Sequence, residues 1–244
     1  MKTRLNTLAI AASLGLMAAA PAFADEVTEK HVQENASAAM AKLNDPDLGP
    51  AERRAEFKEL MNQFTDIDLI AMRVLGKYYQ QFSDAEKAAF TEAFREYALA
   101  TYEAELDKYR GNDINVVSSQ DSEADNTTKV DSVVTSVIDL PDPQKDLTVL
   151  WRVVEFQPQS KYTEVFGPGF KVTDVALDLD GGRIWLAQQQ REQFLSILDK
   201  NGGKADALIA KVKEMTARLN TEAEQRREAL NSAAQSSGSI TRAG

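Results

Sequence analysis

The spacing of apolar residues changes once along this chain, close to Gly111, and the change limits what the chain can fold into. Before this point apolar residues recur every three or four positions, which is typical of amphipathic helices. After it, Val, Ile, Thr and aromatic residues gather in short runs between turn-forming segments, which is typical of strands. None of the links contains a crossover helix, so we predict antiparallel strands. The predicted strands span residues 113–118, 130–140, 147–156 and 170–179.

The helical half is organised around the stretch from Phe57 to Tyr109, which reads as two amphipathic blocks. Ser83 and Glu86 lie between the blocks at the spacing of a capping box, so a new helix is expected to begin there. Gly76 interrupts the first block at a cost of about 1 kcal/mol relative to Ala. We therefore expect a close packing or ligand contact at Gly76.

The remaining helices are placed by their breakers. A first helix is predicted over residues 25–44, followed by a Pro- and Gly-containing loop at 44–50. A break is expected near Thr65, where Asp66 can cap the next helix. Two further helices are predicted after Ile184, the last one capped by Asp206.

The first 24 residues have the layout of a secretory signal. Lys2 and Arg4 precede an apolar run that is too short to span a bilayer, and Ala22-Phe23-Ala24 suits cleavage before Asp25. We expect an exported periplasmic protein with one domain over residues 25–220 and a polar, flexible tail over 221–244. Cleavage would remove two of the 28 basic residues and take the net charge from −10 to about −12. Such an acidic chain does not suit nucleic acid.

The residues needed for catalysis are not gathered in any pattern. The chain has one histidine, His31, and no cysteine. A Cys-His catalytic pair is therefore excluded, and the residues for a Ser-His-Asp triad are not found in a pattern that would form one. His31 is interpreted as an ordinary helix or surface residue. Asp66 and Asp68 are interpreted as helix caps rather than metal ligands, and the segment 178–182 as a turn rather than a calcium loop. We predict no enzyme activity, no cofactor and no metal site.

The aromatic residues leave two alternatives open. Phe90, Phe94 and Tyr97 recur at helical spacing; such a stripe is most often core packing, and the alternative is a wall that contacts a ligand. The third strand carries apolar residues on both faces, so both faces need cover. One face is expected to meet the helices, while a ligand or further chain covers the other.

A resemblance bears on this choice. The run FTDIDLIAMRVLGKYY from Phe64 to Tyr79, with the R-x-Q-F segment at Arg191 to Phe194, resembles the toluene-tolerance family, which includes MlaC-type periplasmic phospholipid-binding proteins. The resemblance covers about Phe57 to Leu219. It implies an α+β fold with helices wrapped around a curved, roughly four-stranded antiparallel sheet that encloses lipid tails. It also implies a monomeric, non-catalytic shuttle between an outer-membrane lipoprotein complex and an inner-membrane ABC transporter complex.

The chain departs from the family pattern after Phe170, where it resembles a branch linked to hopanoid-producing bacteria, so another lipid such as a hopanoid is an alternative cargo to phospholipid. A ligand-free periplasmic adaptor is a second hypothesis. The predicted lipid-binding residues come from helix faces and the most apolar strand face, with the tyrosines placed at the wet boundary. They are Val74, Leu75, Tyr78, Phe90, Phe94, Tyr97, Tyr102, Val149, Trp151 and Val153.

Overall fold

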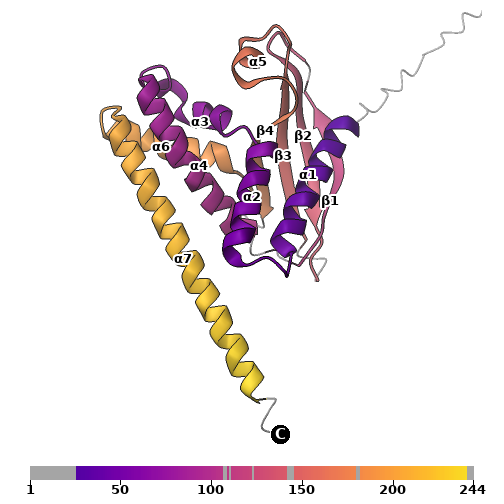
Figure 1. The fold of residues 1–244 in the computed structure, drawn as a ribbon. Helices are drawn as coiled ribbons and strands as arrows, with labels where there is room; N and C mark the ends of the chain where they lie inside the picture. The colour runs from indigo at the N-terminus through magenta and orange to yellow at the C-terminus, as the bar shows by residue number, and fades with distance from the viewer. Residues whose placement is uncertain are drawn as a thin grey trace, which may run out of the picture.

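The structure is a computed structural model that describes residues 26–240 apart from 107–108, 110, 123, 142–145 and 180–181. The predicted signal segment lies outside the described residues. Figure 1 shows the elements in chain order. They are α1 (Glu26–Asn44), α2 (Pro50–Phe64), α3 (Ile67–Leu75), the 3-10 turn η1 (Gly76–Tyr78), α4 (Asp84–Leu106), β1 (Ile114–Asp121), β2 (Thr128–Ile138), β3 (Leu147–Phe156), α5 (Lys161–Phe166), β4 (Lys171–Leu179), β5 (Gly182–Trp185), α6 (Leu186–Lys200) and α7 (Ala205–Ile240).

The strands form one antiparallel sheet in the order β1-β2-β3-β4-β5. The α+β class and the antiparallel arrangement predicted from the sequence are confirmed, but the sheet has one strand more than expected. The missed strand, β5, is four residues long and pairs with β4 from Leu179↔Gly182 to Ala176↔Trp185. So short a run gives no alternation that periodicity can detect, and Ile184 and Trp185 were interpreted as the approach to a helix.

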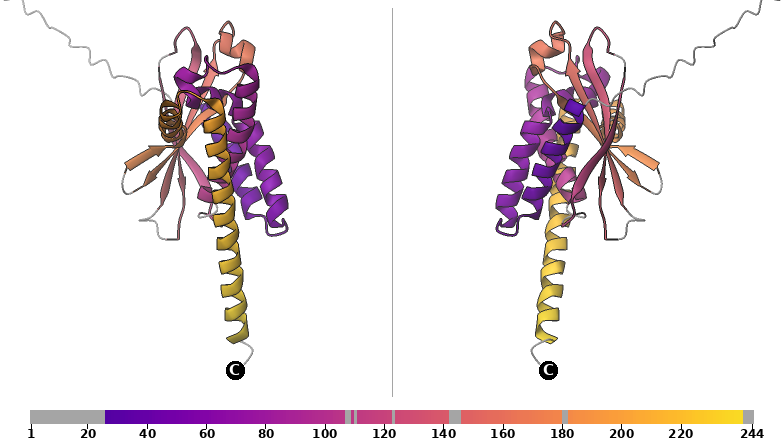
Figure 2. Two further views of the ribbon diagram at one scale, coloured as in Figure 1. Left: turned by 90° about the vertical axis from the view of Figure 1, so that its left-hand side faces the viewer. Right: turned by 90° about the vertical axis from the view of Figure 1, so that its right-hand side faces the viewer.

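Helices cover both faces of the sheet. Figures 1 and 2 show α1 and α2 side by side across one face, with α6 on the other side of the sheet. The strand β3 is buried along almost its whole length, which agrees with its apolar residues on both faces. A small second cluster, to which α3, α5 and β3 contribute side chains, packs on the sheet face away from α1 and α2. It consists of Leu69, Val154 and Phe156 with Met72, Tyr162 and Phe166 around them.

The predicted helix starts at Asp66 and Ser83 are confirmed. The Asp66 carboxylate accepts a hydrogen bond from the Leu69 amide at 2.9 Å. The Ser83 hydroxyl accepts one from the Glu86 amide at 3.3 Å, and Glu86 accepts one from the Ser83 amide at 2.8 Å. The first cap marks the break between α2 and α3, and the second marks the start of α4.

Gly76 lets α6 pack against α3. Its φ of +52° is a conformation that L residues with a side chain rarely adopt. The Arg191 guanidinium lies directly over Gly76, where a Cβ would otherwise stand, and donates a hydrogen bond to the Arg73 carbonyl. Gly76 belongs to the segment from Phe64 to Tyr79 and Arg191 to the R-x-Q-F segment. The two segments that resemble the family therefore contact each other where α3 packs against α6.

The last helix continues past the predicted domain end. α7 is 36 residues long and its C-terminal half extends away from the body of the molecule (Figures 1 and 2). Residues 221–240, expected to be a flexible tail, are helical here, while their mobility stays a prediction. Within the described ranges, no helix combines the length and apolar character needed to cross a membrane.

Candidate functional site

An apolar cavity lies between the α1–α2 hairpin and the sheet face that the hairpin covers. Its volume is about 50 Å³. Helices supply one wall, strands supply the other, and Tyr102 and Leu186 close the side where α4 and α6 approach. The lining residues are Ala36, Ala39, Met40, Phe57, Met61, Phe64, Thr65, Tyr102, Ile114, Val149, Trp151, Val175, Leu177 and Leu186.

The strand wall is made of cross-strand pairs. Val149 on β3 is opposite Leu177 on β4, and Trp151 is opposite Val175. The two-residue period of a strand places all four side chains on one face. The Trp151 indole nitrogen donates to the Ser136 hydroxyl at 2.8 Å, so its one polar group is satisfied within the sheet. The ring therefore presents an apolar surface to the cavity.

The helix wall follows helical spacing on two antiparallel helices. On α1 the lining residues Ala36, Ala39 and Met40 are three and four positions apart, and on α2 Phe57 and Met61 continue the wall. The alanines keep side-chain bulk low where α1 faces the sheet. The thioether side chains of the two methionines are flexible and adapt to irregular apolar shapes.

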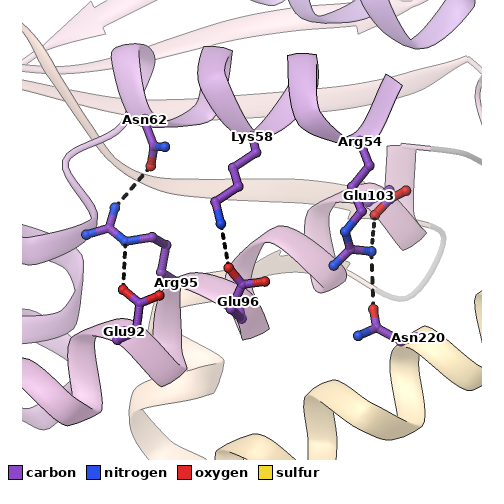
Figure 3. A network of polar contacts seen from close by, with 8 residues as sticks. All are labelled: Arg54, Lys58, Asn62, Glu92, Arg95, Glu96, Glu103 and Asn220. Carbon is purple, nitrogen blue, oxygen red and sulfur yellow. Dashed lines mark hydrogen bonds and ion pairs between the residues drawn. The ribbon is translucent and has the colours of Figure 1, made fainter. Parts of the chain in front are cut away.

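A polar row on α2, beside the face that lines the cavity, is tied to α4 (Figure 3). Arg54 is 2.7 Å from Glu103 and Lys58 is 2.6 Å from Glu96, while Arg95 of α4 donates to Asn62 of α2 at 3.0 Å. Arg54 also donates to Asn220 of α7 at 3.2 Å. Residues 54, 58 and 62 recur every four positions, so α2 has one face for the cavity and another for this polar row.

The first helix is held to the edge strand β1 by side-chain hydrogen bonds, of which those of Gln33 lie beside the cavity. Gln33 donates to the Ile114 carbonyl at 3.0 Å and accepts from the Val116 amide at 2.7 Å. The side-chain amide thus takes the place of a neighbouring strand at the open edge of β1. It also fixes the α1 wall of the cavity beside Ile114.

The end of the cavity at Phe64 is aromatic. The Phe64 ring lies 5.6 Å from the ring of Trp151 and 5.6 Å from that of His31, and His31 lies 5.3 Å from Phe170. Among the described residues the His31 Nε2 atom is buried without a hydrogen-bond partner. Burial lowers the pKa of His31, and the nearby carboxylate of Glu34 opposes that shift in part. His31, which was predicted to be an ordinary helix or surface residue, is therefore half-buried and packs in this aromatic end of the cavity.

Among the described residues, none that lines the cavity is charged, and Tyr102 is the one ionisable group. Burial together with the nearby Asp174 carboxylate raises the pKa of its phenol well above the usual range. The phenol is therefore neutral at any physiological pH. Across the described parts of the chain, no group of three or more acidic, histidine or cysteine side chains is placed to hold a metal ion.

Tyr102, Val149 and Trp151 are the predicted lipid-binding residues that line the cavity. Val153 lies further along the same strand face and is fully buried in the main core. The helical residues among the prediction lie elsewhere. Phe90, Phe94 and Tyr97 pack around Phe194 of α6 with ring centroids 5.9 to 6.0 Å from it.

The other helical residues of the prediction also serve contacts between helices. Val74 and Leu75 belong to α3 and are fully buried in the main core. The Tyr78 hydroxyl donates to Asp199 of α6 at 2.7 Å. Whether any of these side chains contacts a lipid stays a prediction.

Sequence reasoning missed the lining residues of α1 and α2. Ala36, Ala39 and Met40 carried a usable signal, because small and flexible apolar residues recur there at helical spacing. Phe57, Met61 and Phe64 were recognised as an apolar helix face but were not assigned to the site. On β4, the pairing with β3 rather than any local motif brings Val175 and Leu177 into the wall.

Comparison with known proteins agrees with this architecture. The family model described as "MlaC protein" matches residues 33–214. A solved structure of a phospholipid-binding protein from Ralstonia solanacearum, in complex with a phospholipid, is similar with a TM-score of 0.59 and 22% sequence identity, covering 79% of this chain and 98% of that one. At that identity the likeness shows the fold alone. No curated protein matches the chain.

Proposed function

The chain belongs to the MlaC family, and from that premise we propose that it is a lipid-binding protein that holds acyl chains in the apolar cavity between the α1–α2 hairpin and the sheet. The observation that carries the proposal is the cavity itself, whose walls are apolar and, over the part of the chain that the structure describes, carry no charged residue. A solved protein of similar fold is in complex with a phospholipid. We propose a role in binding and transport rather than catalysis.

The energetics suit a carrier. Burial of one methylene group stabilises by about 0.8 kcal/mol relative to water, so two acyl chains of about 16 carbons gain on the order of 20 kcal/mol on leaving water. A bilayer offers nearly the same gain. A carrier therefore needs only to match the membrane interior, and the direction of transfer comes from partners that prefer its loaded or its empty state.

The cavity must widen to take a lipid. A volume of about 50 Å³ has room for a few water molecules and is far smaller than an acyl chain. The sheet wall is held by continuous strand pairing, whereas the helix wall is held to the rest of the chain by side-chain contacts such as those of Gln33 and Lys58. We propose that the α1–α2 hairpin is the wall that moves.

Membership in the family supports a proposal for the wider role. We propose that the protein works in the periplasm as a monomer and carries phospholipid between outer-membrane and inner-membrane transport complexes, the latter an ABC transporter. A hopanoid or other lipid is an alternative cargo for the same cavity. The small volume of the cavity is the observation that favours a second function, a ligand-free periplasmic adaptor.

Native mass spectrometry of the gently purified protein tests the function. We expect wild type to carry co-purifying lipid, which extraction and lipid analysis then identify. The variant Ala39→Trp places an indole in the cavity and is expected to lose most of this lipid. Ala38→Trp is the matched control, because Ala38 is the neighbouring half-buried alanine of α1 and does not line the cavity.

Circular dichroism and thermal unfolding check that both variants are folded. Lipid on wild type and Ala38→Trp but not on Ala39→Trp supports the carrier and assigns the cavity. Wild type that is empty, and whose unfolding temperature does not change with added lipid, contradicts the carrier and favours the adaptor.

A further inference from the structure

A polar recess adjoins the aromatic end of the apolar cavity. It lies at the turn between α2 and α3 and has a volume of about 190 Å³. Phe64 and Thr65 line both spaces, so they form the wall between the recess and the cavity. The residues that line the recess are Asn62, Gln63, Phe64, Thr65, Asp66, Ile67, Asp68, Arg95 and Lys171.

The recess gathers two cations from distant parts of the chain. Arg95 comes from α4 and Lys171 from the first position of β4, and their side chains are 26% and 22% exposed. The protein as a whole carries a net charge of −10, so most of its surface repels anions. The recess lines these two cations with two carboxylates, Asp66 and Asp68, so it is neutral by count while the chain as a whole is acidic.

These cations keep hydrogen-bonding capacity. The nearest carboxylate oxygens lie 3.8 Å from Arg95, on Asp68 and on Glu92, and 3.7 Å from Lys171, on Asp66, which is beyond hydrogen-bond length. Arg95 donates one hydrogen bond at 3.0 Å, to Asn62 (Figure 3). A guanidinium has five N–H donors and an ammonium three, so beyond these contacts with described residues both side chains keep donors for a ligand.

Placement and charge together identify the ligand chemistry. We propose that the recess holds the phosphodiester headgroup of a zwitterionic lipid, with the phosphate on Arg95 and Lys171 and the headgroup amine on Asp68. This inference rests on the proposed function, since the tails of the same lipid would occupy the cavity beyond Phe64. Two cations and two carboxylates line the recess, so a headgroup of zero net charge finds a partner for each of its charges.

A lipid with an uncharged headgroup substituent fits the recess less well. Phosphatidylglycerol offers the same phosphate to Arg95 and Lys171 but has no cation for the Asp68 carboxylate, whose side chain is 66% exposed. The recess and the phosphatidylglycerol headgroup together then carry one excess negative charge, which discriminates against this ligand. The recess therefore sets a preference between headgroups that an apolar cavity alone does not.

Loading from vesicles tests the proposal. Wild type is incubated with vesicles of phosphatidylethanolamine or phosphatidylglycerol of identical chains, and bound lipid is measured by native mass spectrometry. Because hydrogen bonds to charged groups are involved, we expect Lys171→Gln and Arg95→Gln to lower phosphatidylethanolamine loading about tenfold. Lys161→Gln, an exposed lysine of α5 outside the recess, is the matched control and is expected to load like wild type. Asp68→Asn is expected to reduce the preference for phosphatidylethanolamine over phosphatidylglycerol.

The outcomes separate this proposal from the function on which it rests. Wild type that loads neither lipid overturns phospholipid as the cargo, and the carrier function itself falls if the purified protein also carries no co-purifying lipid. Equal loading of phosphatidylethanolamine by wild type, Lys171→Gln and Arg95→Gln overturns the headgroup recess while the carrier function stands. Inorganic phosphate provides the last arm, because a free-phosphate site would bind it with micromolar affinity in calorimetry whether or not lipid is present, and that result also overturns the headgroup assignment.

Discussion

The contact between Gly76 and Arg191 allows the effect of substitutions on the free energy of unfolding to be worked out from the structure. Gly76→Ala imposes a side chain on a backbone with φ of +52° and ψ of −122°, a conformation that costs a non-glycine residue about 1–3 kcal/mol. Its Cβ also occupies the space of the Arg191 guanidinium. That group is the far end of a flexible side chain and can move away, but it then gives up its hydrogen bond to the Arg73 carbonyl.

Loss of that hydrogen bond costs about 1–2 kcal/mol, so Gly76→Ala is expected to lower the free energy of unfolding by about 2–5 kcal/mol. For a chain of this size, that corresponds to a fall in unfolding temperature of about 4–20 °C. Arg191→Ala removes only the hydrogen bond and its packing, and is expected to cost about 1–2 kcal/mol. In the double variant the guanidinium is already gone, so only the backbone cost is added.

Chemical denaturation of wild type, the two single variants and the double variant measures the coupling. We expect the double variant to be about as stable as Gly76→Ala alone, so the two changes fall short of additivity by about the whole cost of Arg191→Ala. Changes at independent sites add to within about 0.5 kcal/mol. Additive losses would therefore refute the reasoning, because they would mean that the Arg191 guanidinium does not occupy the space that the Cβ of Gly76→Ala takes.

Three other changes probe separate contacts. Phe194→Ala removes a fully buried ring and should cost about 3–5 kcal/mol in denaturant, with co-purifying lipid per folded molecule unchanged because Phe194 does not line the cavity. Gln33→Leu leaves the Ile114 carbonyl and the Val116 amide without their partner, so hydrogen exchange should speed up at Val116 while amides in the centre of β3 keep their protection. Burial lowers the pKa of His31 in the folded state, so its contribution to stability is present above the unfolded pKa of about 6.5 and is lost as pH falls through that value toward the folded pKa. His31→Gln should flatten the dependence of the denaturation midpoint on pH between about 7.5 and 5, and an unchanged slope would contradict the assignment.

The sequence predicted the sheet better than the helix contacts. Strand limits were close for β2, β3 and β4, because Val-rich runs between turn residues leave few alternatives. The helix starts at Asp66 and Ser83 were recognised because capping depends on local side chains. The strand β5 and the helical continuation to Ile240 were missed, because a four-residue strand and a polar helix beyond the main core carry no strong periodic signal.

The same distinction explains which site residues could be found. In a strand, the two-residue period fixes the face of every side chain, so once Val149 faced the helices, Trp151 had to face them too. A buried helix offers no such inference, because apolar residues surround much of its circumference and the partner of each face depends on the path of the whole chain. Phe94 and Tyr102 share α4 and are both buried, yet Phe94 meets Phe194 while Tyr102 meets the cavity. What separates them is the approach of α6, and that approach depends on Gly76 and Arg191, which are distant from both residues in sequence.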